Sequence, residues 1–234
     1  MTSSKRQKTG IDYALSVASS KSGMRFHRMV WLFLTFIFGR FYCKVEGIDR
    51  EYLDTPGPLI VAPVHRSNLD APLLVTLTRR RLNFLAKESL FSPKAVGWFI
   101  SALGGIPISR GAGDREALKA AQALLERGES IVVFPEGTRQ TGNKVGQVFE
   151  GAAFLAARTG AKVVPVGIAG TEHALPSGAK FPKRSRTCYV VGEPMELSNP
   201  QGGRVTAPQR KAFMEELALR LQSLFDEALV RNSS

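Results

Sequence analysis

The chain has 234 residues, 44% hydrophobic and 22% charged, so it can bury a core and is too balanced for a disordered, collagen-like or disulfide-scaffold protein. Its two cysteines and three histidines lie far apart without metal-ligand spacing, which argues against a structural disulfide and a zinc site. A net charge of +12 predicts attraction to polyanions, namely nucleic acid, anionic lipid or an acidic carrier.

Residues 1–44 are basic first and apolar afterwards. Before residue 29, Asp12 alone opposes six basic residues, which are Lys5, Arg6, Lys8, Lys21, Arg25 and Arg28. The apolar run Met29 to Phe38 follows; even with Gly39 it would extend about 16 Å as a helix, roughly half of a bilayer's hydrocarbon core. Bulky residues after it do not form a signal-peptide cleavage site. We expect a retained, membrane-associating helical segment; an apolar helix packed on the domain is the alternative.

From residue 45 onward, short apolar runs alternate with longer helical stretches. The expected strands are 59–62, 82–86, 106–109, 130–134, 162–168 and 188–191. The expected helices are 69–78, 93–103, 114–127, 147–158 and 208–230. Alternating strands and helices predict an α/β fold in which helices cover both faces of a largely parallel central sheet. In such sheets the working residues gather beyond the carboxyl ends of the strands.

His65 and Asp70 follow the first of these strands. Five residues apart, they would point away from each other in a regular helix or strand, so only a strand-to-helix turn lets them meet. If they meet, the carboxylate can orient the imidazole and leave its second nitrogen free as a base. A histidine with a purely structural role is the alternative on this stretch alone.

Glu136 and Arg139 follow the strand 130–134 in a tight turn with Gly137. Here Arg139 can offer a bidentate fork to a phosphate while Glu136 holds it in position. An ordinary surface ion pair is the alternative. The run 104–110 ends another strand with Arg110; a lone arginine at such a position is more often solvated than functional.

Four ordered blocks across roughly residues 59 to 168 resemble the glycerolipid acyltransferases, most closely the 1-acylglycerol-3-phosphate acyltransferases. The blocks are His65-x4-Asp70, Gly105 to Arg110, Phe134-Pro135-Glu136-Gly137-Thr138-Arg139 and Val164 to Ile168. The resemblance implies that His65 is the base and that Asp70 orients it. It further implies a site for the acceptor phosphate. The residues of this site would be Lys87, Arg110, Glu136, Gly137, Thr138 and Arg139. Residues 45–234 would then be the acyltransferase α/β domain.

The same resemblance implies a membrane-associated acyltransferase that moves a fatty acyl group from an acyl thioester to a lysophospholipid hydroxyl. The donor would be acyl-CoA or an acyl-carrier protein, and neither a cofactor nor a metal is expected. The expected acceptor is 1-acylglycerol-3-phosphate, which would give phosphatidic acid. Glycerol-3-phosphate or another glycerolipid is the alternative, because Val64 and Arg66 flank His65 where that branch of the family usually has Asn and Gln.

The residue inventory favours direct acyl transfer, because the chain has neither a GxSxG elbow nor a plausible nucleophilic cysteine. The expected location is the cytoplasmic face of a membrane, peripheral or monotopic, with anionic lipids as partners. A basic nucleic-acid-binding protein is the competing class. No nucleic-acid partner is expected, because basic residues are spread among apolar runs and no DNA- or RNA-binding signature occurs.

Overall fold

The computed structural model describes residues 12–108, 114–176, 178–179, 181–198 and 204–233. In this part of the chain, seven strands form one sheet in the order β1-β7-β6-β2-β5-β3-β4. The strands are β1 (Val45–Ile48), β2 (Leu59–Pro63), β3 (Leu82–Lys87), β4 (Gly105–Ile108), β5 (Ser130–Val132), β6 (Lys162–Ala169) and β7 (Thr187–Val191). All neighbours are parallel except β6 and β7. The predicted largely parallel sheet is confirmed.

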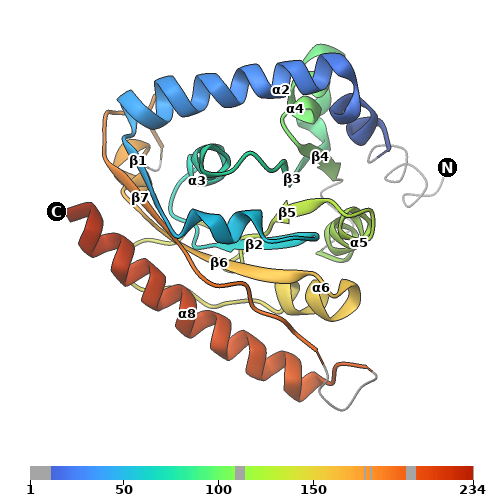
Figure 1. Ribbon diagram of the computed structural model, residues 1–234, viewed down its shortest axis with the longest axis vertical. Coiled ribbons are helices and arrows are strands. Elements are labelled where there is room, and N and C mark those ends of the chain that lie inside the picture. Colours follow the sequence, from blue (N-terminus) through green and yellow to red (C-terminus); the bar gives the residue numbers. More distant parts are fainter. Residues whose placement is uncertain (1–11, 109–113, 177, 180, 199–203, 234) are drawn as a thin grey trace.

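Helices cover both faces of this sheet (Figure 1). They are α3 (Asp70–Leu74), α4 (Lys94–Ala102), α5 (Asp114–Leu125), α6 (Gly151–Thr159), α7 (Thr171–Ala174) and α8 (Ala207–Ser233). The chain moves from β2 to β3 to β4 in one direction across the sheet and returns through β5 to β6. Right-handed crossovers therefore place α3 and α4 on one face, and α5 and α6 on the other, where α8 packs on β6 and β7.

Several predicted elements are shorter than expected, and in two of them a tertiary contact overrides the local pattern. The helix expected over 69–78 is α-helical only in α3 and continues as a 3-10 turn, Val75–Leu77. The strand expected over 130–134 ends at Val132, because the chain turns there toward the end of β2. The helix expected over 147–158 begins at Gly151, because the backbone of Phe149 is hydrogen-bonded to Pro135.

Edge strand β1 and the short helix α7 were not expected from the sequence. The strand β1 contains Glu46 and Gly47, which are poor strand formers, and it forms by pairing with β7. Gly47 also lets the strand approach Leu77 closely, since a Cβ there would lie 2.6 Å from a methyl carbon of that side chain.

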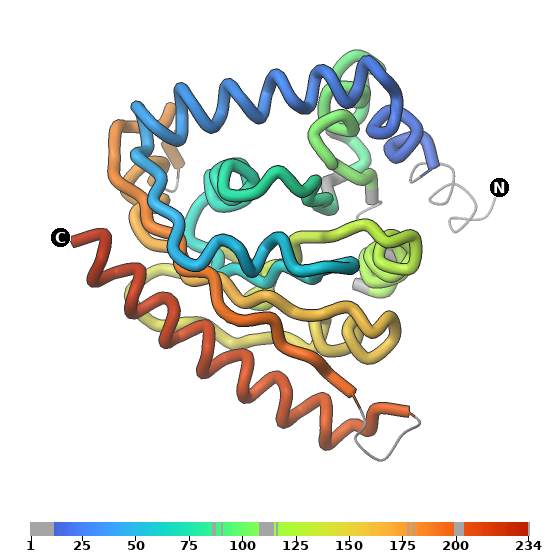
Figure 2. The backbone as a smooth tube through the Cα atoms, viewed as in Figure 1, coloured from blue at the N-terminus to red at the C-terminus, as the bar shows by residue number. Residues whose placement is uncertain are grey.

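The N-terminal region is helical and lies over α3 and α4 (Figure 1). Residues 12–19 form a helix, and α2 (Lys21–Phe33) begins at Ser20, whose Oγ accepts a hydrogen bond from the Gly23 amide. The π-helix η1 (Leu34–Tyr42) continues α2 without a break. The run predicted between Met29 and Phe38 is thus part of a longer helical span. Figure 2 shows α2 and α8 on opposite sides of the sheet.

This helical span packs on the domain with one side and exposes the other. Trp31 and Phe38 face inward, and the Trp31 indole N–H donates to the carbonyls of Val75 and Thr78. The exposed side, here called the α2–η1 apolar face, consists of Met29, Leu32, Phe33, Phe36, Ile37 and Phe41. Within the described ranges, no helix is long and apolar enough to cross a membrane.

Candidate active site

The turn after β2 brings His65 and Asp70 together, as the sequence predicts. His65 Nδ1 lies 2.9 Å from Asp70 Oδ2, and Asp70 is fully buried at the start of α3. The same Oδ2 accepts hydrogen bonds from the amides of Arg66 and Ser67, at 2.6 and 2.8 Å. Oδ1 accepts one from the Thr171 hydroxyl at 2.6 Å. These donors fix the carboxylate in place.

This arrangement determines which imidazole nitrogen can react. A carboxylate surrounded by donors acts as an acceptor, so His65 Nδ1 carries the hydrogen and Nε2 keeps a free lone pair. The imidazole also stacks on the Phe134 ring, with centroids 3.9 Å apart. Its side chain is 19% exposed, so the ring is held on two sides while a reactant can still approach it. The geometry suits a general base.

Glu136 occupies a different place from the one predicted. It is buried; its Oε2 accepts a hydrogen bond from the His65 amide at 2.7 Å, and its Oε1 accepts one from the Gly146 amide at 2.7 Å. Its ion-pair partner is Arg66, with Nη2 3.4 Å from Oε1. The predicted pair with Arg139 is wrong, because the adjacent strands β2 and β5 turn Glu136 toward the His65 loop and away from solvent.

Arg139 is exposed and has no ion-pair partner in the part of the chain that the structure describes. Gly137 adopts a left-handed conformation with φ +68°, which a glycine tolerates best. Gly137 and Thr138 are both exposed. One residue beyond Arg139, the Gln140 amide donates to the His65 carbonyl at 2.8 Å. Both backbone groups of His65 are therefore bonded to the loop that carries Arg139.

Arg66 joins the two loops to α8. Its guanidinium group lies over the Phe225 ring at 4.3 Å and also donates to the Lys144 carbonyl. The pKa of Arg66 is lowered from its ordinary value, because the effect of burial outweighs the opposite effect of the negative charge of Glu136. No sequence pattern points to this role of Arg66, because its carboxylate partner lies 70 residues away in the chain.

Thr171 is a second residue that the sequence analysis missed. It follows β6, and β6 pairs with β2, so the carboxyl ends of these two strands lie side by side. That strand-end position is the signal that could have identified it. Of the remaining predicted residues, Lys87 ends β3, where its backbone is in register with Ile108 of β4. The side chain of Lys87 and the whole of Arg110 lie outside the described residues.

An apolar cavity of about 590 Å³ lies beside the His65 turn. It extends between β3, β5, α5 and α6, and Phe134, Gly137 and Phe149 are among its lining residues. Phe134 both lines this cavity and stacks on the His65 imidazole. The volume and the apolar lining suit a hydrocarbon chain whose polar end reaches His65.

Comparisons with known proteins agree with this geometry. The profile of the Acyltransferase family matches residues 44–169. A chloroplastic 1-acyl-sn-glycerol-3-phosphate acyltransferase of Arabidopsis thaliana is 31% identical, covering 67% of this chain and 44% of its own length. A lyso-ornithine lipid O-acyltransferase of Pseudomonas aeruginosa is 32% identical, covering 51% of this chain and 46% of its own length. The chain spans less than half the length of these two relatives.

Among solved structures, the 1-acyl-sn-glycerophosphate acyltransferase PlsC of Thermotoga maritima shares the fold. It has a TM-score of 0.68 and 24% identity, with 95% of this chain and 97% of that chain covered. The family profile covers more than half of this chain and includes the strands that carry His65 and Glu136. The chain therefore belongs to the Acyltransferase family.

Proposed function

We propose that the protein transfers a fatty acyl group from an acyl thioester to a hydroxyl of a lysophospholipid, with 1-acylglycerol-3-phosphate as acceptor and phosphatidic acid as product. The observation that carries this proposal is the hydrogen bond between His65 Nδ1 and a buried Asp70, which leaves Nε2 available as a base. Similarity to 1-acyl-sn-glycerol-3-phosphate acyltransferases supports the choice of acceptor.

In the proposed reaction, His65 Nε2 takes the proton of the acceptor hydroxyl as its oxygen attacks the thioester carbonyl. The C–S bond then breaks, and the leaving thiolate takes the proton back from the imidazolium. The negative charge of Asp70 stabilises that imidazolium, and its hydrogen bond keeps the ring oriented. The donor is acyl-CoA or an acyl-carrier protein, and the apolar cavity beside Phe134 receives its acyl chain.

Arg139 is the proposed contact for the acceptor phosphate, because it is exposed, uncompensated and attached to the loop that is bonded to His65. Lys87 and Arg110 are assigned to the same phosphate, and Gly137 and Thr138 to the adjoining rim. Glu136 has a positioning role in this proposal: it accepts a hydrogen bond from the His65 amide, pairs with Arg66 and does not contact the acceptor.

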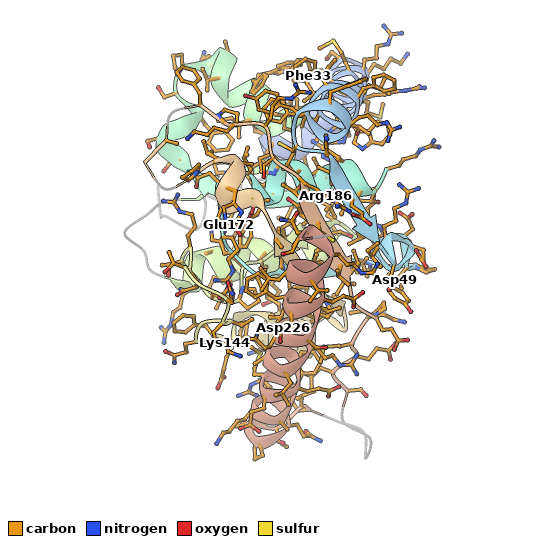
Figure 3. All side chains as sticks on the ribbon, turned by 90° about the vertical axis from the view of Figure 1, so that its left-hand side faces the viewer. Phe33, Asp49, Lys144, Glu172, Arg186 and Asp226 are labelled. Carbon is orange, nitrogen blue, oxygen red and sulfur yellow. The ribbon has the colours of Figure 1, made fainter. Side chains whose placement is uncertain are left out.

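Residues 1–44 form the proposed membrane-associating segment. Exposed apolar patches of this kind mark interaction surfaces, and the α2–η1 apolar face is flanked by the exposed cations Arg25, Arg28 and Arg40. Figure 3 shows Phe33 of this face near the top of the molecule, well above Asp226 of α8. The protein would lie on the cytoplasmic face as a peripheral or monotopic enzyme, bound to anionic lipids.

A panel assay tests the reaction. Purified full-length protein is offered 1-acylglycerol-3-phosphate, glycerol-3-phosphate and lyso-ornithine lipid with acyl-CoA and with acyl-carrier protein. The highest kcat/KM is expected with 1-acylglycerol-3-phosphate. A higher value for glycerol-3-phosphate or for lyso-ornithine lipid, which lacks a phosphate, would overturn the acceptor assignment. No transfer to any of the three would overturn the proposed function.

The positioning role of Asp70 has its own test. In Asp70→Asn, an amide group replaces the carboxylate that accepts hydrogen bonds from the amides of Arg66 and Ser67. Its N–H would face these donors and disturb the orientation of His65, so kcat should fall at least about tenfold. Thr171→Val removes one of the donors and leaves the His65 contact intact, so its effect on kcat should be smaller. An unchanged kcat in Asp70→Asn would contradict the proposed role.

A further inference from the structure

A second cavity lies away from His65, between α2 and the connection that leads into β3. It measures about 390 Å³, which is within the range of small-molecule sites, and is lined by His27, Arg28, Trp31, Leu32 and Arg79. We call it the Arg79 cavity. The connection precedes β3, whereas His65 follows β2, and both strands are parallel to β5. The Arg79 cavity and the His65 site therefore belong to opposite edges of the sheet.

The cavity is a fixed feature of the fold. The Trp31 indole N–H donates to the carbonyls of Val75 and Thr78, at 3.1 and 2.9 Å, and so attaches α2 to the connection just before Arg79. Figure 1 shows this connection, between α3 and β3, passing beneath α2. The two elements that bear the cations are thus held together before any ligand arrives.

The three arginines of the connection have different surroundings. Arg80 donates to the carbonyls of Thr55 and Gly57, and Arg81 donates to those of Ser101 and Ala102. Arg79 is exposed, and its guanidinium group has no partner within the described ranges. Backbone carbonyls therefore bind the guanidinium groups of Arg80 and Arg81, whereas Arg79 has no such partner in the described ranges.

The Arg79 cavity is lined by two arginines, and no carboxylate of the described residues lines it. The Arg28 guanidinium also lacks a partner among the residues that the structure describes. His27 Nδ1 is buried without a hydrogen bond. Glu129 lines an adjoining cavity, which His27, Arg79 and Arg81 also line, and it accepts a hydrogen bond from Asn83. Two guanidinium forks facing one cavity are the arrangement that binds phosphate oxygens.

The position of the cavity identifies the source of that phosphate. Leu32 lines the cavity and also belongs to the α2–η1 apolar face. A phosphate held by Arg28 and Arg79 would therefore lie at the border of an apolar surface, as a lipid phosphate does relative to its acyl chains. A free phosphate ion has no apolar part that could contact the adjacent apolar surface.

We propose that the Arg79 cavity binds the phosphate group of an anionic phospholipid, as a site separate from the His65 centre. Arg28 and Arg79 bind the phosphate oxygens, and Trp31 and Leu32 contact the glycerol and the first methylene groups. The site gives the membrane-bound protein one defined orientation, which diffuse attraction between basic residues and headgroups does not provide.

Trp31 supplies a direct readout, because the chain contains only two tryptophans. In full-length Trp98→Phe protein, the fluorescence of Trp31 is followed while monomeric dihexanoyl phosphatidylglycerol is added. This lipid is neither substrate nor product of the proposed reaction. We expect a saturable change, with at least about tenfold weaker binding of dihexanoyl phosphatidylcholine and of inorganic phosphate. Equal binding of phosphatidylcholine or of inorganic phosphate would overturn the proposal.

Variants separate this site from charge effects and from catalysis. Arg79→Gln should weaken phosphatidylglycerol binding about tenfold, and the double variant Arg28→Gln/Arg79→Gln should weaken it further. Arg50→Gln removes the same charge from an exposed position that lines neither the Arg79 cavity nor the apolar cavity, and should change nothing. His65→Ala should bind as the parent does, even if the proposed transferase reaction proved wrong. Unchanged binding in Arg79→Gln, or lost binding in His65→Ala, would refute the site.

Discussion

At the carboxyl edge of the sheet, Asp70 and Glu136 are buried and each accepts several hydrogen bonds from neighbouring loops. Across the sheet, Arg28 and Arg79 are exposed, face one cavity and have no partner in the described part of the chain. Both edges are rich in charge, but the charges of Asp70 and Glu136 hold neighbouring backbone in place, whereas those of Arg28 and Arg79 hold none in the described residues.

The difference reflects two physical tasks. A general base must be held within a fraction of an ångström of its working position, so the groups around it are committed before substrate arrives. A surface that binds lipid works by leaving cations and apolar side chains without partners until the membrane supplies them. Substitutions at the two edges should therefore affect different measurements.

The largest effect is expected at His65. Loss of a general base costs about 10²- to 10⁴-fold in rate, so His65→Ala should reduce acyl transfer by at least about 100-fold. The unfolding midpoint in urea and the binding to anionic vesicles should stay as in the parent, because the ring is partly exposed and Asp70 keeps its other donors. More than a tenth of the parental activity in this variant would contradict the mechanism.

Arg139 and Glu136 should separate substrate binding from support of the fold. Arg139→Lys keeps the charge and loses the fork, so the KM for the acceptor should rise about tenfold while the KM for the thioester stays constant.

Glu136→Gln should instead lower the free energy of unfolding, by about 1–3 kcal/mol, because it weakens buried bonds to His65 and Arg66. Steady-state kinetics and urea titrations test both; a kinetic effect of Arg139→Lys on the thioester alone would reverse the assignment.

The α2–η1 apolar face should show the opposite pattern. Phe33→Ser/Phe36→Ser removes two exposed aromatic rings, so the fraction of protein that sediments with anionic vesicles should fall several-fold. Turnover of monomeric short-chain substrates should not change. Leu219→Ser, at an exposed position of α8 on the other side of the sheet, is the matched control and should sediment normally. Equal losses in both variants would argue against a membrane-facing surface.

The smallest effect is expected on the pH dependence of folding stability, through Cys43 after η1 and Cys188 in β7. Burial raises the pKa of Cys43 and of Cys188 to about 11, above the ordinary thiol value. The unfolded chain thus loses these protons at lower pH than the folded chain, so folding stability should decline as pH rises from about 9 to 11. Urea titrations across this range should show the decline, which Cys43→Ala/Cys188→Ala should reduce. Fast labelling of the folded parent by iodoacetamide at pH 8 would contradict the burial.

Most of the fold follows from local patterns in the sequence. Continuous apolar runs predict the buried strands, and their alternation with helical stretches predicts a parallel sheet. The elements that failed are those whose boundaries depend on distant partners. The strand β1 needs β7, and residues 147–150 stay outside α6 because the Phe149 amide donates to the Pro135 carbonyl. No short-range propensity contains these contacts.

The sequence by itself determined that His65 and Asp70 lie at a strand end, five residues apart, where a turn can join them. The tertiary structure alone decided which cation Glu136 meets, because the partner Arg66 lies in the turn after the adjacent strand β2 rather than in the same loop. It also decided that Arg80 and Arg81 bind carbonyls while Arg79 has no partner among the residues that the structure describes. The physical reason is the same in both cases: a charge chooses its partner by distance in space, and strand order in the sheet sets that distance.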